Sequence, residues 1–254
     1  MLAAAIGMLV LFRADTVTTM AAVWRSSAAY GHGFLVAPIS MALIVLRWPR
    51  IRHLPARPSA TGLALALLFA LAHSAGEATG TQTLATAALV AQIPAAFLAV
   101  LGRRIVRELA FPLGFLAFMI PIGDFLIAPL QQAMMAVIEV ALTTAGIPHF
   151  VDGIRLSTPT GEFMINETCA GLRYLISTIV PSSLFAHFAL RSRRRRTVFM
   201  VLAVAVPILA NGLRGIVVVM VDYHLGGGSA IAADHALYGW ALHGAVFAML
   251  LAIG

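Results

Sequence analysis

The sequence predicts an all-α polytopic membrane protein with about seven to eight transmembrane helices. Hydrophobic residues make up 61% of the 254 residues and charged residues 11%, whereas soluble domains average about 45–50% and about 25%. The mean hydropathy is +0.94, and the apolar residues gather in runs long enough to cross a bilayer. Such a chain cannot cover itself with polar surface in water, which excludes a soluble enzyme, a disordered chain and a disulfide-stapled secreted domain.

Apolar runs define the expected spans, because a crossing helix needs about 20 mostly apolar residues, with a range of about 17–25. The runs are 1–12, 33–47, 60–76, 82–101, 109–128, 130–146, 169–190, 197–221 and 236–254. The first lacks the basic start of a signal peptide, so either the start is trimmed or this span continues past Asp15 towards Trp24. No repeat or linker divides the chain, so we expect one integral membrane domain over residues 1–254, whose termini need not be complete.

The basic residues indicate which loops face the cytoplasm. The net charge is +7, and all 17 basic residues are arginines. In a soluble protein this charge would suggest nucleic acid, but arginines in short loops between spans mark the cytoplasmic side, so no nucleic-acid partner is expected. The three clusters are Arg47, Arg50, Arg52 and Arg57; Arg103, Arg104 and Arg107; and Arg191, Arg193, Arg194, Arg195 and Arg196.

Counting crossings from these loops places residues 129–168 on the outer side of the membrane. The 130–146 run is therefore expected to be a re-entrant or interfacial helix. Between it and the next span, Ile154 and Leu156 alternate with polar residues before a turn signal at 159–161, and Phe163 and Ile165 alternate after it. This pattern predicts a small β-hairpin on the outer surface.

Cys169 is the one cysteine of the chain. It follows the predicted hairpin in a segment that we expect to open a helix, with Asn166 or Thr168 as the N-cap. Cys169 would then lie in the first turn, where free backbone N–H groups favour an anion. Arg173 lies four residues on and would share its helix face. Both features favour the thiolate, so Cys169 is either a nucleophile or a buried small apolar residue.

Two further polar sites lie in the last two runs. Arg214 is about 10 Å below the outer end of the 197–221 run at about 1.5 Å per residue. A charge at that depth costs about 2.5–3.5 kcal/mol on insertion scales, so Arg214 is a functional candidate unless it snorkels to the interface. Asn211, one turn earlier, is a possible hydrogen-bond partner. His235 lies at the outer start of the last run, where a histidine can act as acid or base near neutral pH.

The predicted topology brings Cys169, Arg214 and His235 to the outer side from three separate helices. A thiol, an arginine for an oxyanion and a base are the groups needed for acyl transfer through a thioester. The histidines show no His-x-x-x-His pair and the chain no Cys-x-x-Cys, so we expect neither a metal nor another cofactor.

A transporter or channel is the alternative class of function, because intramembrane Asn211 and Arg214 suit it as well. The spans do not show the two similar halves with interrupted helices that mark many transporters. Blocking Cys169 by alkylation separates the two classes, since a transporter should largely keep its flux. A different intramembrane protease or acyltransferase is a third possibility, which would keep the site and change the substrate.

Motifs along most of the chain resemble the exosortases, membrane-embedded cysteine transpeptidases related to archaeosortases. They are Tyr-Gly-His-Gly-Phe-Leu-Val-Ala-Pro-Ile-Ser at 30–40, Phe-Pro-Leu at 111–113, Phe-Met-Ile-Pro at 118–121, the stretch 146–153, Glu-Thr-Cys-Ala-Gly-Leu-Arg at 167–173, Asn-Gly-Leu-Arg at 211–214 and His-Ala-Leu-Tyr-Gly-Trp at 235–240. Gly31 and Ala170 stand where the family often has serine, and neither is one of the three candidate catalytic positions.

The resemblance implies that Cys169 is the nucleophile and that Arg214 and His235 complete the catalytic set. It also implies the substrates: exported proteins whose C-terminal PEP-CTERM-type sorting signal has a Pro-Glu-Pro-like motif, a transmembrane helix and a basic tail. Cleavage would transfer the exported protein to an acceptor that the sequence does not identify. The enzyme would lie among the lipids of the bacterial inner membrane, with its active site facing the periplasm.

Three residues are expected to support this chemistry. Arg173 would stabilise the thiolate or bind a substrate carboxylate. Glu167 would pair with Arg173 or with the intramembrane arginine, and Asn211 would orient that arginine.

Overall fold

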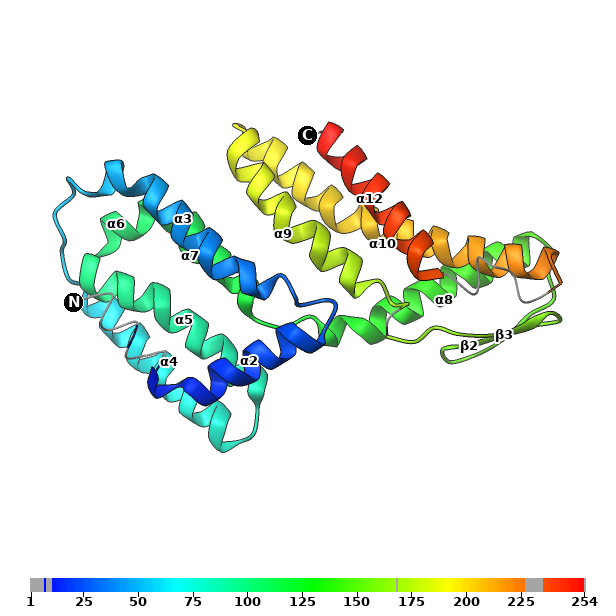
Figure 1. Cartoon of the computed structure of the whole chain (residues 1–254), viewed down its shortest axis with the longest axis horizontal. Coiled ribbons are helices and arrows are strands. Elements are labelled where there is room, and N and C mark those ends of the chain that lie inside the picture. Colours follow the sequence, from blue (N-terminus) through cyan, green and yellow to red (C-terminus); the bar gives the residue numbers. More distant parts are fainter. Residues whose placement is uncertain (1–6, 8–10, 168, 227–234, 254) are drawn as a thin grey trace. The chain divides into compact units, whose positions relative to one another are not determined.

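The computed structural model describes residue 7 and residues 11–167, 169–226 and 235–253, of which only the backbone is described at 235–238 and at 253. These residues are mostly helical (Figure 1). They fall into two compact units, Met1–Ile122 and Gly123–Gly254, which are taken here one at a time. The expected single domain over 1–254 stays a prediction.

The first unit is built from helices alone within its described residues. They are α2 (Ala14–Ser26), α3 (Gly33–Ile51), α4 (Ala60–Ala78), α5 (Gln82–Leu101), α6 (Arg103–Glu108), α7 (Ala110–Phe115) and the 3₁₀ helix η1 (Leu116–Met119). Helices α3, α4 and α5 confirm three of the expected runs as helices. Most of the 1–12 run lies outside the described residues; a separate helix, α2, begins at Ala14 and continues past Trp24, so the two alternatives for this span stay open.

Helices α4 and α5 form a close pair in this unit. Gly62 lies against the backbone at Ala99, and Gly76 lies against the backbone at Ala85, where an added Cβ would be 2.6 Å from the amide nitrogen. Small residues let helix backbones approach closely, which is how helices associate in a bilayer, where apolar burial gives little driving force.

The expected span over 109–128 is wrong. The helix ends after η1, Ile120 is extended with φ −78° and ψ 119°, and the chain then enters the short 3₁₀ helix η2 (Asp124–Leu126). Pro121 explains the break, because a proline clashes with a helical conformation of the residue before it. The carbonyl of Phe118 is paired with His32 Nε2 and that of Met119 accepts from Trp24 Nε1, both at 3.0 Å.

The second unit combines helices with a small sheet. Its further elements are α8 (Ile127–Thr144), β1 (Phe150–Asp152), β2 (Arg155–Thr158), β3 (Gly161–Met164), α9 (Leu172–Ala189), α10 (Arg193–His224) and α12 (His235–Ile253). The sheet is antiparallel in the order β1-β2-β3. Strands β2 and β3, with Leu156 opposite Phe163, confirm the predicted hairpin, and β1 adds a third strand beside it.

An apolar core fixes the sheet to two helices of this unit (Figure 1). It joins α8, the sheet and the second half of α10, and its buried members include Met134, Ile138, Leu142, Leu156, Ile165 and Val219. The half-buried Cys169 packs against this core. The core therefore fixes the segment that carries the thiol.

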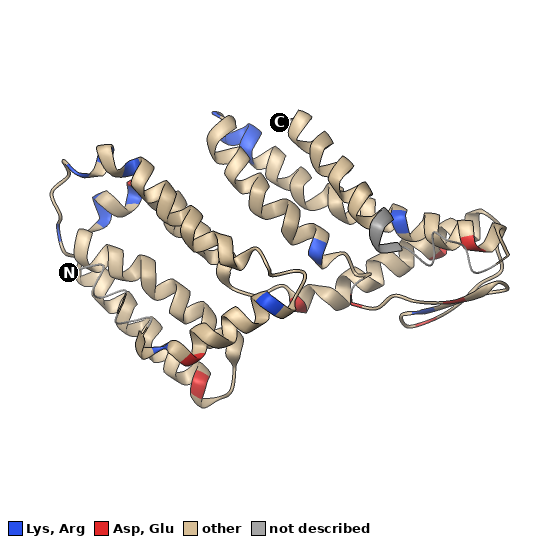
Figure 2. Ribbon diagram, viewed as in Figure 1, with Lys and Arg blue, Asp and Glu red and all other residues tan. Residues whose placement is uncertain are grey.

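Among the described residues, five helices are long and apolar enough to cross a membrane: α3, α4, α5, Asp124–Thr144 and α10. A multi-pass membrane protein is thereby supported, whereas the count of seven to eight crossings is not confirmed. The α8 segment qualifies by length and composition, so its re-entrant placement stays a prediction. Arginines gather at the end of α3 with the loop after it and on α6 in the first unit, and at the start of α10 in the second (Figure 2).

Candidate functional site

Cys169 lies in a turn that precedes α9, and not in the first turn of that helix as the sequence suggested. Helix α9 begins at Leu172, and its N-cap is Gly171, which is left-handed with φ +86°. Because Cys169 is outside the helix, Arg173 does not share a helix face with it. Asn166 is therefore not the N-cap of the helix, as the sequence suggested it could be; its Oδ1 instead accepts from the Cys169 N–H at 3.1 Å within the turn. Thr168 lies outside the described residues.

Gly171 fixes where the thiol turn ends and α9 begins. Its positive φ is a conformation that residues with a Cβ rarely adopt. A Cβ would also lie 2.6 Å from Asn211 Nδ2 and 2.8 Å from Asn211 Cγ. The backbone of Gly171 thus lies directly against the side-chain amide of Asn211 on α10.

That amide connects the thiol turn with Arg214 on α10. Asn211 Nδ2 donates to the carbonyl of Cys169 at 2.9 Å, and its Oδ1 accepts from Arg214 Nε at 3.3 Å. Asn211 is 5% exposed and Arg214 9%, so both bonds are shielded from solvent and are worth more than surface bonds. The hydrogen bond expected between Asn211 and Arg214 is therefore present, and Asn211 also holds the backbone at Cys169.

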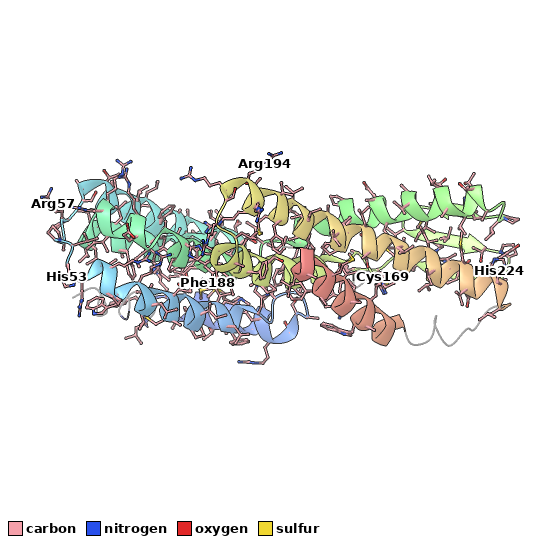
Figure 3. The ribbon with its side chains drawn as sticks, turned by 90° about the horizontal axis from the view of Figure 1, so that it is seen from above. His53, Arg57, Cys169, Phe188, Arg194 and His224 are labelled. Atoms are coloured by element: carbon pink, nitrogen blue, oxygen red, sulfur yellow. The ribbon has the colours of Figure 1, made fainter. Side chains whose placement is uncertain are left out.

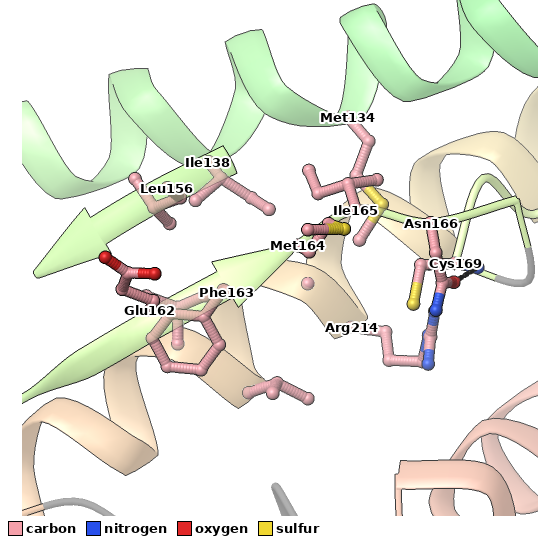
Figure 4. A pocket seen from close by; sticks show the side chains of 13 residues that line it. Met134, Ile138, Leu156, Glu162, Phe163, Met164, Ile165, Asn166, Cys169 and Arg214 are labelled. Atoms are coloured by element: carbon pink, nitrogen blue, oxygen red, sulfur yellow. Dashed lines mark hydrogen bonds between the residues drawn. The ribbon is translucent and has the colours of Figure 1, made fainter. Parts of the chain in front are cut away.

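Cys169 and Arg214 line one pocket of about 230 Å³ in the second unit. In Figure 4 the two side chains lie at the same end of the pocket, with Asn166 beside them. Helix α8 and strands β2 and β3 provide the other walls. The pocket is therefore lined by both a free thiol and a buried guanidinium.

Tyr174 is a residue of the site that sequence reasoning missed. Its buried ring lies 5.7 Å from the guanidinium carbon of Arg214 and 5.1 Å from that of Arg173. Arg173 also lies 5.1 Å from the ring of Trp240 on α12, and His243 of the same helix lies 5.1 Å from Tyr174. Cation–π contacts hold a guanidinium over a ring face without neutralising it. In the sequence, Tyr174 has only the signature of a core aromatic.

Two expected site residues have different outcomes: His235 is untested, and Glu167 pairs with neither arginine among the described residues. The backbone of His235 begins α12, and its side chain lies outside the described residues, so its approach to Cys169 stays a prediction. Glu167 is exposed in the thiol turn, and within the described part of the chain it forms no ion pair with Arg173 or Arg214. The described residues also hold no group of three or more metal-ligating side chains.

The arrangement defines a class of protein: a polytopic membrane protein with a thiol and a buried arginine on one pocket. A family model for the transmembrane exosortase (Exosortase_EpsH) matches residues 24–252, and the chain belongs to that family. None of the curated proteins or solved structures compared with the chain matches it. The family consists of transmembrane sorting enzymes, generally cysteine transpeptidases, that act on exported proteins with sorting signals.

Proposed function

We propose that this chain is a cysteine protease and transpeptidase that cleaves PEP-CTERM-type sorting signals at the outer face of the bacterial inner membrane. One observation carries the proposal: in a member of the exosortase family, the single thiol and the intramembrane arginine line the same pocket. Structural packing alone would account for a small residue at Cys169, but gives no reason to bury a guanidinium beside it at a cost of several kcal/mol.

In the proposed reaction, Sγ of Cys169 attacks the carbonyl carbon of the scissile peptide bond as a thiolate. The carbonyl becomes an oxyanion, which Arg214 stabilises. The C–N bond then breaks, and His235 gives its proton to the departing amine as a thioester forms on Sγ. A second nucleophile, either water or an acceptor hydroxyl or amine, attacks the thioester and releases the thiolate.

The surroundings of Arg214 suit an oxyanion. Among the described residues its hydrogen bond uses Nε, with Asn211 Oδ1 as acceptor, and the ring of Tyr174 lies against the guanidinium. The two terminal nitrogens can therefore donate together to one oxygen. Groups held in place before the reaction stabilise developing charge without reorganisation, which makes this effect large in many enzymes.

The length of α10 supports the outer location. The helix has 32 residues, which at about 1.5 Å per residue is about 48 Å, and this exceeds a hydrocarbon layer of about 30 Å. Arg194 and His224 lie near its opposite ends, with Cys169 between them (Figure 3). If the arginine-rich end lies in the cytoplasm, the thiol lies towards the outer boundary.

Arg173 and Glu167 have supporting roles in this proposal. Arg173 is held between the rings of Tyr174 and Trp240, and its charge would bind a substrate carboxylate or stabilise the thiolate. Glu167 is exposed at the thiol turn, where it can pair with an arginine once substrate is bound.

Co-expression with a tagged protein that carries a sorting signal tests the proposal. Cys169→Ala should abolish processing, measured as loss of the faster-migrating product on a blot. Val201→Ala is the control, because Val201 is 60% exposed on α10 and does not line the pocket, and it should process normally. Full processing by Cys169→Ala would refute the thioester mechanism.

A further inference from the structure

The pocket beyond Cys169 and Arg214 has mostly apolar walls. They come from Met134 and Ile138 on α8, Leu156 and Phe163 on the sheet, and Val219 on α10. Its volume of about 230 Å³ is below the roughly 300–1,000 Å³ of pockets that hold whole small molecules. A volume of this size suits one or two side chains of a larger ligand.

Gly215 keeps this volume open at the wall formed by α10. A Cβ at Gly215 would collide with Met134 Cε and lie 2.9 Å from Ile138 Cδ1. The glycine therefore leaves room on α10 for the ends of the Met134 and Ile138 side chains, which form part of the pocket wall.

The polar groups of the pocket are unevenly placed. Asn166, Cys169 and Arg214 lie together at one end, and Glu162 lies apart from them (Figure 4). Glu162 is largely exposed and paired with Arg155 at 2.9 Å. A charged or amide side chain inserted among the apolar walls would lose its hydration without gaining a partner, which is unfavourable.

We propose that this pocket is the subsite for an apolar side chain of the substrate, on the residue that supplies the scissile carbonyl. The inference rests on the proposed function, since it assumes that the Cys169 thiol attacks a peptide carbonyl. An aliphatic or aromatic side chain at that residue fills the pocket while its carbonyl carbon lies beside Sγ and its oxygen beside Arg214. The enzyme then selects an apolar residue at the cleavage point, in addition to any other feature of the signal.

Thiol labelling tests the pocket without requiring catalysis, because Cys169 is the one cysteine in the chain. Methanethiosulfonates react with the thiolate to form a mixed disulfide and release methanesulfinate. Rates would be measured by intact mass on the purified full chain in detergent, each divided by the rate of the same reagent with free cysteine. The normalised rate of benzyl methanethiosulfonate should exceed the normalised rates of the sulfonatoethyl and trimethylammonioethyl methanethiosulfonates by about tenfold. This is the gain expected when an apolar group is buried on binding.

Two neighbouring valines provide matched variants. Val218 lines the pocket, whereas Val217 is 44% exposed and does not. Val218→Phe should lower the rate at which the benzyl reagent labels Cys169 about tenfold, while the rate of labelling by the small methyl methanethiosulfonate should stay nearly unchanged. Val217→Phe should change neither rate. Equal slowing of both reagents by Val218→Phe, or a charged reagent as the fastest on the wild-type chain, would overturn the subsite. The wild-type ranking decides the matter even if Val218→Phe does not fold.

A substrate series separates this inference from the proposed function. Leu, Phe, Asp or Lys would be placed before the mapped cleavage point of a tagged substrate. Preferential processing of the Leu and Phe substrates supports the subsite, and equal processing of all four overturns it. If no substrate is processed while the benzyl preference remains, the proposed function fails and the apolar pocket stands.

Discussion

At the scale of single residues, Gly171 decides where the thiol lies. Its left-handed conformation separates the turn that carries Cys169 from α9, and its missing side chain leaves room for the Asn211 amide. The placement of the Cys169 turn against Asn211 of α10 thus depends on one residue that takes no part in chemistry.

Gly171→Ala should lower the free energy of unfolding by about 1–3 kcal/mol, because alanine would be strained at this φ, and the contact with Asn211 adds to the loss. Processing should fall in parallel as the turn shifts. Gly244→Ala on α12 is the control, since nothing lies within 4 Å of its added Cβ. Thermal unfolding in detergent and a processing assay measure both effects. Equal stability of the two variants would contradict the role given to Gly171.

The residues of the site could be predicted unevenly from the sequence. Asn211 and Arg214 are three apart on one helix, so their hydrogen bond follows from helical spacing. The position of Cys169 before the helix does not follow from the sequence. A glycine inside an apolar run, such as Gly171, gives no sign of whether it continues a helix or caps one. Tyr174 depends on contacts with α10 and α12, which lie far along the chain, and no local pattern reports them.

At the scale of elements, the broken helix at 116–121 is stabilised by side chains from before α3. Trp24 and His32 satisfy the two carbonyls that η1 leaves without helical partners. Non-helical backbone at membrane depth is tolerated only where protein or water satisfies it. The Tyr-Gly-His and Phe-Met-Ile-Pro motifs, which are far apart in sequence, are therefore parts of one structural feature.

Trp24→Phe keeps an aromatic ring but removes the donor to Met119. Leaving that carbonyl unsatisfied should cost about 1–3 kcal/mol of stability. Trp48→Phe is the matched control, because Trp48 is 58% exposed on α3 and its indole forms no hydrogen bond among the described residues. Thermal unfolding of both variants in the same detergent measures the difference. A smaller loss for Trp24→Phe than for Trp48→Phe would show that the bond is unimportant.

The predicted elements failed and succeeded for identifiable reasons. The hairpin was predictable because apolar residues two apart flank a Pro and Gly turn on both sides, and Leu156 and Phe163 lie opposite one another in the sheet. Pro121 in the 109–128 run could have indicated the helix break. The span was nevertheless predicted there because the run is long and apolar. The third strand, β1, is only three residues long, too short to show any period.

At the scale of the whole molecule, membership in the exosortase family and five helices long enough to cross a bilayer agree with the class expected from composition. Composition was enough to predict this class because every helix that crosses a bilayer needs apolar surface along its full length. The number of crossings could not follow, since α10 with 32 residues is longer than a single standard span, and the 109–128 run is broken after Met119.

Sidedness can be tested with a membrane-impermeant thiol reagent on intact spheroplasts. Cys169 should react from outside. A variant with Cys169→Ala and Ser192→Cys should react only after permeabilisation, because Ser192 precedes α10 among the arginines that mark the cytoplasmic side. The fraction of protein that is labelled, measured by its mass shift, gives the accessibility of each of the two cysteines before and after permeabilisation. The opposite pattern would place the thiol in the cytoplasm and refute an outward-facing site.

The length of α10 also bears on where a substrate is cut. Arg214 lies 18 residues after Arg196, which along a helix is about 27 Å. A substrate helix whose basic tail stays level with the arginine loop would bring to the thiol whichever residue lies about that far from its tail. Under the proposed function, α10 would set the cleavage position by its length, so that this position would depend on the length of the substrate's anchor as well as on the residues at the bond.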